Sequence, residues 1–261
     1  MWWNRALLVP HLVRLGLRAP RDVSTRWDRY WAGVTATGDG GDVLWDSSSS
    51  DEAQRYLDLL AAHADPGLPV VDVGCGNGRF TRALAGRFPR AVGVDLAASA
   101  VARARRESPP GVEFRTADMT APGAGAALAA DLGGCHVFVR GLLHTLDPPA
   151  RLRLAANAAD LLGDRGTLLV AETNYPGPLL GYLENLGAGA AGVPHPLAVA
   201  ISAGIPRPTT FGTTELAAAF PPTAWTHVHT DVDARIATVP MGRAGSADSI
   251  PGLVAVLRRR T

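Results

Sequence analysis

The strongest constraint on the fold is the regular alternation of short apolar segments with helical patterns between residues 68 and 173. The short, largely apolar segments are typical of buried strands, and they read LPVVDVG, AVGVD, VEFRTAD, CHVFVRG and GTLLVAET. Strands that alternate with helices at this spacing connect through right-handed crossovers, which build a mostly parallel sheet with helices on both faces. We therefore predict an α/β fold with a doubly wound sheet.

The two ends of the chain depart from this alternation. Residues 1–50 are predicted to form an N-terminal cap, and residues 51–261 the main domain. Within that domain, residues 174–212 are rich in proline and glycine, and they are predicted to form an insertion after the fifth strand. Two strands follow at 225–239 and 252–257 without a helix between them, so they should pair antiparallel and complete a sheet of seven strands.

Composition excludes several classes of function. The chain has 25 basic and 24 acidic residues, and this balance lacks the basic excess that phosphate-dominated nucleic-acid binding requires. Every basic residue is arginine, so a Schiff-base lysine and a P-loop lysine are both excluded. The only cysteines, Cys75 and Cys135, cannot build a disulfide framework or a multi-cysteine zinc site, which favours a cytoplasmic protein.

No segment approaches the roughly 18 consecutive apolar residues of a membrane span, so stable membrane insertion is not expected. In residues 1–19 the apolar run is interrupted early by Pro10 and Arg14, which is atypical of a secretion signal. The segment suits a short lid or a partner-binding helix, and peripheral membrane contact is the alternative. The sequence leaves the oligomeric state open, a homodimer included.

The motif with the clearest chemical meaning is VVDVGCGNGRF at residues 70–80, where a buried strand enters a glycine-rich turn that opens a helix. Glycines let the backbone approach a ligand closely, and the helix N-terminus favours negative charge nearby. Asp95 ends the next strand about 20 residues later, where an acidic residue meets ribose hydroxyls in doubly wound sheets. This combination predicts a site for a nucleotide-like cofactor.

A nicotinamide or flavin site is the competing interpretation. Its fingerprint needs a third glycine three positions after the second. Arg79 or Thr81 stands there, depending on which glycine is counted first. The fingerprint therefore fails in both registers.

Taken together, these motifs resemble the class I S-adenosylmethionine-dependent methyltransferases over roughly residues 51–173. VVDVGCGNG has the form of their first motif, GVDLAASAV and TADM follow in the expected order, and CHVFVRGLLHTL and GDRGTLLVAE are similar to their fourth and fifth strand regions. The resemblance implies a Rossmann-like fold, S-adenosyl-L-methionine as cofactor and S-adenosyl-L-homocysteine as product. The cofactor-binding residues that it implies are Asp72, Gly74, Cys75, Gly76, Asn77, Gly78, Asp95, Leu96, Asp118, Met119 and Arg140.

Individual roles follow from the same resemblance. Asp95 matches the acid that binds the ribose, and Leu96 a residue that packs near the adenine. Asp118 and Met119 match the segment against the adenine ring and its amino group. Arg140 is placed near the methionine moiety, with a helix-capping role as the alternative.

His144 is the candidate acid or base, because histidine titrates near neutrality and this one lies just past the fourth strand. A structural histidine is the alternative. Candidate substrate contacts are aromatic or polar side chains of the cap and the insertion, which otherwise serve only packing. They are Trp27, Tyr30, Trp31, Trp45, Asn174, Tyr175 and Tyr182.

Missing motifs narrow the methyl acceptor. The segment VRGLLHT lacks the Asn/Asp-Pro-Pro-aromatic motif of enzymes that methylate nucleic-acid amino groups, and neither cysteine follows a proline. Magnesium-dependent catechol enzymes carry an acid at the end of the fourth strand, where Arg140 and Gly141 stand here, so no metal is expected. We expect methyl transfer to an oxygen, hydroxyl or carboxylate, of a small molecule in specialised metabolism. N- or C-methylation, a peptide acceptor and a non-catalytic cofactor-binding partner protein stay open.

Overall fold

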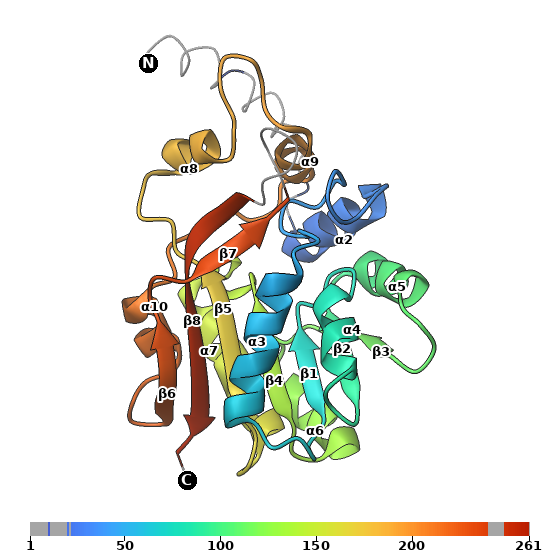
Figure 1. Ribbon diagram of the computed structural model, residues 1–261, viewed down its shortest axis with the longest axis vertical. Coiled ribbons are helices and arrows are strands. Elements are labelled where there is room, and N and C mark those ends of the chain that lie inside the picture. The colour runs from blue at the N-terminus through green and yellow to red at the C-terminus, as the bar shows by residue number, and fades with distance from the viewer. Residues whose placement is uncertain (1–9, 11–19, 21, 240–247, 261) are drawn as a thin grey trace.

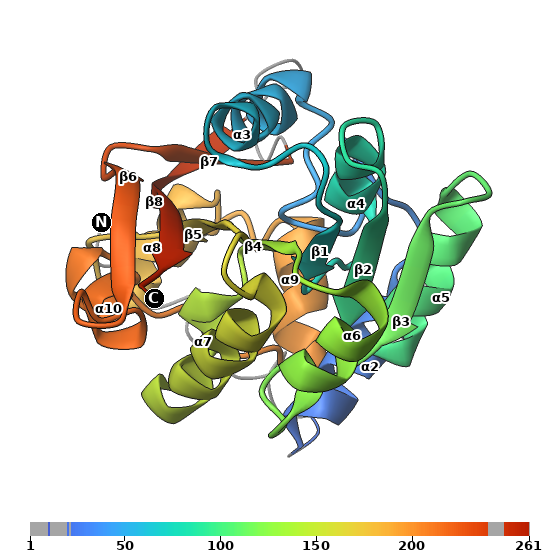
Figure 2. The same ribbon diagram turned by 90° about the horizontal axis from the view of Figure 1, so that it is seen from below.

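The computed structural model describes residues 10, 20, 22–239 and 248–260, and it shows a mixed sheet with helices on both faces (Figure 1, Figure 2). Neighbouring strands follow the order β3-β2-β1-β4-β5-β8-β6, and β7 also pairs with β8. Strands β1 to β5 are parallel, whereas β8 runs antiparallel to β5, β6 and β7. The strands are β1 Val70–Val73, β2 Ala91–Asp95, β3 Glu113–Thr116, β4 His136–Arg140, β5 Leu168–Thr173, β6 Trp225–Asp231, β7 Arg235–Thr238 and β8 Asp248–Arg259.

This topology confirms the predicted doubly wound, Rossmann-like sheet with an antiparallel end. The strand order reverses between β1 and β4, because β2 and β3 lie on one side of β1 and β5 lies beyond β4. At such a reversal the loops that follow adjacent strands leave in opposite directions and open a crevice at the carboxyl ends of the strands.

Alternating side chains give the sheet two apolar faces. Phe138 and Leu169 pack beneath α3 and α4, whereas the neighbouring Val137 and Val170 face α6, α7 and α10. Figure 2 shows α3 and α4 on one side of the sheet and α6 and α7 on the other. These helices are α3 Ser50–His63, α4 Arg79–Ala85, α6 Ala124–Leu132, α7 Pro148–Leu162 and α10 Thr213–Ala219, and α5 Ala98–Glu107 packs beside β2 and β3.

The antiparallel end differs from the sequence expectation in one respect. The segment expected as a single strand over 225–239 breaks after Asp231 and resumes at Arg235, so the sheet has eight strands and not seven. Both parts pair with β8, which spans 12 residues and extends beyond the main sheet. Figure 1 shows β7 and the start of β8 projecting from the sheet toward α8 and α9.

The predicted cap and insertion lie together over the carboxyl ends of the strands (Figure 1). Helix α2 Val23–Gly33 packs against α5 and against α9 His195–Ala203, and the insertion also contains α8 Leu179–Asn185. The insertion thus holds two helices. The segment 1–19 lies almost entirely outside the described residues. Among the residues described, no helix is long and apolar enough to cross a membrane.

Candidate functional site

Two cavities adjoin at the carboxyl end of the parallel strands. The first cavity, about 520 Å³, opens at the ends of β1 and β2. The second cavity, about 790 Å³, lies between the ends of β4 and β5, the insertion and β7. Residues common to both walls mark where the cavities meet, and they are Arg26, Trp27, Trp45, Arg140, Gly141, Thr145 and Pro206.

The first cavity contains the predicted cofactor residues with one exception. Its wall includes Asp72, Gly74, Cys75, Gly76, Asn77, Asp95, Leu96, Asp118, Met119 and Arg140. Gly78 does not line it. A Cβ atom at Gly78 would come within 2.5 Å of the Phe114 ring, so this glycine permits close packing beneath the turn.

Gly76 lies in the glycine turn with a φ of +55°, a conformation that L side chains rarely adopt. A Cβ atom there would also come within 2.7 Å of the Trp31 ring, so the cap closes directly on the turn. Cys75 next to it is buried, and this burial raises the pKa of its thiol well above the usual range. The thiol is therefore neutral and unsuited to nucleophilic attack.

Asp95 is fixed at the end of β2 by backbone donors. Its Oδ2 accepts a hydrogen bond of 3.0 Å from the Gly76 N–H, and its Oδ1 accepts one of 2.9 Å from the Ala97 N–H. Burial raises the pKa of Asp95, and these two backbone donors oppose that effect. The carboxylate is thereby held rigidly in the wall of the first cavity, a geometry suited to a diol.

Asp118 and Met119 follow β3 on the wall of the same cavity. The Thr120 N–H and hydroxyl both donate to Oδ1 of Asp118, at 2.8 and 2.7 Å, while Met119 is buried beside it. Their expected contact with adenine suits these positions and stays a prediction.

Asp72 is a buried carboxyl group inside β1. The Thr81 hydroxyl donates to its Oδ2 at 2.5 Å. Burial is the largest influence on this group and raises its pKa from 3.8 to about 7. The native protein therefore holds this proton more tightly than the unfolded chain does.

This raised pKa predicts that Asp72→Asn stabilises the empty protein at alkaline pH. The stability contributed by proton binding is fully present below the unfolded pKa, and it is lost as pH rises through the native pKa of about 7. At pH 8 we expect the variant to gain up to about 4 kcal/mol in free energy of unfolding, a gain that disappears near pH 4. Urea titrations at both pH values measure it. An equal difference at the two pH values would contradict the assignment.

Arg140 is buried and engaged by a partner that the sequence analysis missed. Its Nη2 lies 2.8 Å from Oε2 of Glu52, a buried residue of α3, and its guanidinium also donates to the backbone carbonyls of Trp45 and Ala237. The helix-capping alternative is therefore wrong. Arg140 instead joins α3, the cap and β7 at the boundary of the two cavities, and its charge is compensated by Glu52.

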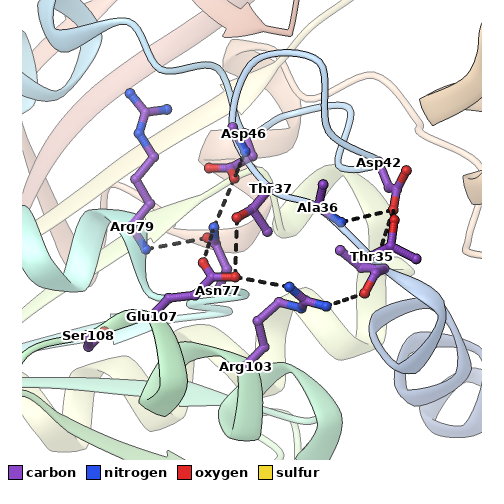
Figure 3. A network of polar contacts seen from close by, with 12 residues as sticks. Thr35, Ala36, Thr37, Asp42, Asp46, Asn77, Arg79, Arg103, Glu107 and Ser108 are labelled. Atoms are coloured by element: carbon purple, nitrogen blue, oxygen red, sulfur yellow. Dashed lines mark hydrogen bonds and ion pairs between the residues drawn. The ribbon is translucent and has the colours of Figure 1, made fainter.

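Asn77 points toward the cap rather than standing free in the turn (Figure 3). Its amide donates to Oδ2 of Asp46 at 2.8 Å and to Oε2 of Glu107 at 3.2 Å. Glu107 also accepts hydrogen bonds from Thr37 and Arg103, whose guanidinium reaches a cap carbonyl as well. Polar contacts thus connect the glycine turn, α5 and the cap.

The four cap aromatics divide between packing and cavity wall. Tyr30 is 1% exposed and lines neither cavity, while its ring stacks on Trp45 at a centroid distance of 5.3 Å. Trp31 lines the first cavity, and Trp27 and Trp45 line both. Packing, one of the two roles considered from the sequence, therefore fits Tyr30, while the cavity-lining role fits the three tryptophans.

The insertion residues divide in the same way. Tyr182 lines the second cavity, whereas Asn174 and Tyr175 are not in its wall. The Tyr175 ring packs edge-on against Tyr182 with the centroids 5.5 Å apart. A direct substrate contact is therefore best supported for Tyr182.

His144 lies in a short 3₁₀ turn, Leu143–Thr145, directly after β4 and lines the second cavity. Its Nδ1 is 2.6 Å from Oε2 of Glu172, a fully buried carboxylate near the end of β5. Glu172 also accepts the backbone N–H groups of Leu142, Leu143 and His144 at 2.8 to 3.2 Å. Glu172 was not among the residues predicted from the sequence, although an acid at the end of the strand beside β4 was a usable signal.

This pairing determines what the imidazole can do. An ionised carboxylate only accepts hydrogen bonds, so the proton of a neutral His144 is assigned to Nδ1 and Nε2 is left as the basic nitrogen. A base oriented by a buried carboxylate can take a proton from a bound hydroxyl group. His144 and Glu172 therefore form a candidate acid–base pair in the wall of the second cavity.

The remaining wall of the second cavity is mainly aliphatic. Its apolar residues include Leu44, Leu179, Leu183, Leu197, Ile201, Ile205, Ile236 and Ile250. The buried Thr238 also lies in this wall, and its hydroxyl has no hydrogen-bond partner among the described residues. A cavity with this volume and lining is typical of a site for a largely apolar small molecule.

Comparison with known proteins identifies the kind of domain. Residues 70–166 match the family model described as "Methyltransferase domain". Trans-aconitate 2-methyltransferase from Acidovorax sp. (strain JS42) is 36% identical over 80 residues, which cover 30% of this chain and 31% of that protein. The aligned stretch thus spans less than a third of this curated relative.

Solved structures share the fold over most of the chain. A SAM-dependent methyltransferase from Anabaena variabilis ATCC 29413 superposes with a TM-score of 0.77 at 24% identity, covering 93% of this chain and 97% of that one. The magnesium protoporphyrin IX methyltransferase of Synechocystis PCC 6803, solved with bound SAH, has a TM-score of 0.51 at 18% identity, with coverages of 81% and 82%.

Proposed function

We propose that this chain, whose residues 70–166 match a methyltransferase domain, is a class I S-adenosylmethionine-dependent enzyme that transfers the methyl group of this cofactor to a hydroxyl oxygen of a small molecule. The observation that carries the proposal is the pairing of His144 with the buried Glu172 in the wall of a cavity that adjoins the cofactor cavity. A hydroxyl group needs such a base, because its proton must leave as the new bond forms.

The first cavity fits the cofactor by several independent features. Its volume of about 520 Å³ lies within the range of small-molecule sites. The glycine turn at Gly74 and Gly76 lines this cavity, and Asp95 presents acceptor oxygens suited to a ribose diol. We assign the ribose to Asp95, the adenine to Asp118 and Met119, and the methionine end to the glycine turn beside Asp72.

The chemistry divides simply between cofactor and protein. When bound, the cofactor supplies an electrophilic methyl group on its sulfonium, so the protein mainly binds, orients and excludes water. Trp27 and Trp45 line both cavities and would shield the junction between them from solvent. His144 would accept the acceptor proton at Nε2 while Glu172 holds the ring in place.

A carboxylate oxygen is the second candidate acceptor. Arg26 and Arg207 line the second cavity and would favour an acidic molecule there. The curated relative named above is a trans-aconitate methyltransferase, which adds support from its name alone. A carboxylate is already ionised at neutral pH, so this reaction would not need His144 as a base.

The setting of the reaction is also part of the proposal. We place the protein in the cytoplasm, which suits the buried, unpaired thiols of Cys75 and Cys135. We place the acceptor in specialised metabolism, because the large apolar cavity suits a bulky metabolite better than a small polar one. A peptide end, an amine or carbon acceptor, and a non-catalytic role are outcomes that the following experiment separates.

The test follows a labelled methyl group. Purified protein is incubated with methyl-labelled S-adenosylmethionine and a metabolite extract of the producing organism, and the label is measured in the product fraction before and after mild base. We expect base-stable label on oxygen. Label released as methanol would instead identify a carboxylate ester, and label on nitrogen or carbon would overturn the oxygen assignment. Cofactor binding without any transfer would support the non-catalytic alternative.

A further inference from the structure

The charged side chains described in the wall of the second cavity are all positive. Among the residues described, Arg26, Arg140 and Arg207 line the cavity, and no aspartate or glutamate does. An apolar cavity with only positive charge in its wall attracts anions and repels cations.

The three arginines differ in whether their charge is compensated. Arg140 forms a buried ion pair with Glu52 at 2.8 Å, so it contributes little net charge to the cavity. Arg26 donates from Nε to the Pro20 carbonyl at 2.5 Å, and this partner is neutral. Neither Arg26 nor the exposed Arg207 forms an ion pair with any described residue. Asp22, in the wall of the first cavity, interacts electrostatically with Arg26 but forms no ion pair with it, so neither guanidinium is held in an ion pair that would compete with a ligand.

We infer that the acceptor is an apolar carboxylic acid whose carboxylate is bound by Arg26 and Arg207. A guanidinium binds carboxylates through paired, charge-assisted hydrogen bonds. The aliphatic side chains of the insertion and of β7, such as Leu197, Ile201 and Ile236, enclose the body of the molecule. The same positive charge disfavours a cationic amine as acceptor.

Arg26 also gives the site an orientation. It lines both cavities, whereas Arg207 lines only the second. The acid group of the ligand therefore lies toward the junction, near His144 and the cofactor cavity, and its apolar body extends toward α8 and α9. This inference rests on the proposed function only in taking the second cavity as the acceptor site, and it holds whether a hydroxyl or the carboxylate itself is methylated.

The test compares ligands that share a chain and differ in charge. Decanoate, decan-1-ol and decylamine are titrated into the full-length protein in the presence of saturating S-adenosylhomocysteine, and binding is measured by calorimetry. We expect decanoate to bind at least about ten-fold more tightly than decylamine, with decanol between them. Equal affinities for decanoate and decylamine, or no binding of decanoate, would overturn the inference.

Two variants assign the effect to the arginines. Arg207→Gln and Arg26→Gln should each weaken decanoate binding by about ten-fold and leave decanol binding unchanged, since each removes one charge-assisted contact. Arg106→Gln replaces an exposed arginine of α5 that lines neither cavity, and it is the matched control. Unchanged decanoate affinity in both variants would overturn the assignment. Failure to bind S-adenosylhomocysteine would contradict the proposed function instead, so the two failures are distinguishable.

Discussion

Replacement of His144 by glutamine should lower turnover by about 10²- to 10⁴-fold, the usual contribution of a general base. Cofactor affinity should stay unchanged, because His144 lines the second cavity and not the first. Initial rates with the acceptor found in the labelling experiment measure the first effect, and calorimetry with S-adenosylhomocysteine measures the second. His229→Gln, a histidine of β6 in the wall of neither cavity, is the control.

Glu172 should act through His144 and not on the substrate itself. Glu172→Gln removes the negative charge beside His144 and leaves one acceptor oxygen for Nδ1 of His144 and three backbone N–H groups, so turnover should fall with little change in KM. The pH dependence of kcat should also shift, since the charge beside the imidazole is lost. If Glu172 had a purely structural role, the substitution would lower thermal stability without changing the pH dependence of kcat. If turnover is unchanged in His144→Gln, then His144 is not the general base, and a carboxylate acceptor is favoured.

The second large effect concerns the cofactor. Asp95→Ala should weaken the binding of S-adenosylmethionine and S-adenosylhomocysteine by about 100-fold, because hydrogen bonds between a carboxylate and two ribose hydroxyls are lost. The affinity of Asp95→Asn for both ligands should lie between those of Asp95→Ala and the parent protein, since the amide keeps one acceptor oxygen. Calorimetric titration of both ligands measures the effect.

A control separates this effect from damage to the fold. Asp95 also accepts a hydrogen bond from the Gly76 N–H, so part of any loss of cofactor affinity arises from a loosened glycine turn. A lower thermal unfolding midpoint would reveal that part. Asp164→Ala removes an exposed aspartate that lines neither cavity and should change neither quantity. An Asp95→Ala protein that binds the cofactor as tightly as the parent would refute the ribose assignment.

Local patterns in the sequence were sufficient for the sheet and for the wall of the first cavity. Asp72, Asp95 and Asp118 each lie within or just after a predicted strand, and in a parallel sheet the carboxyl ends of strands meet at one edge. The same reasoning failed at 225–239, where the alternation of apolar residues continues but the chain turns at Val232, which is 54% exposed. Alternation predicts the exposure of side chains and carries no information on where a strand breaks.

The sequence by itself determined the doubly wound sheet, the glycine turn and the position of Asp95, because each depends on residues that are neighbours along the chain. Only the tertiary structure decided that Glu52 compensates Arg140 across 88 positions and that Glu172 orients His144 across 28. It also decided that the described side chains in the wall of the second cavity include arginines and no acid. Such pairings arise from the packing of the cap, the insertion and β7 over the sheet, and a local pattern does not specify which distant side chains that packing brings together.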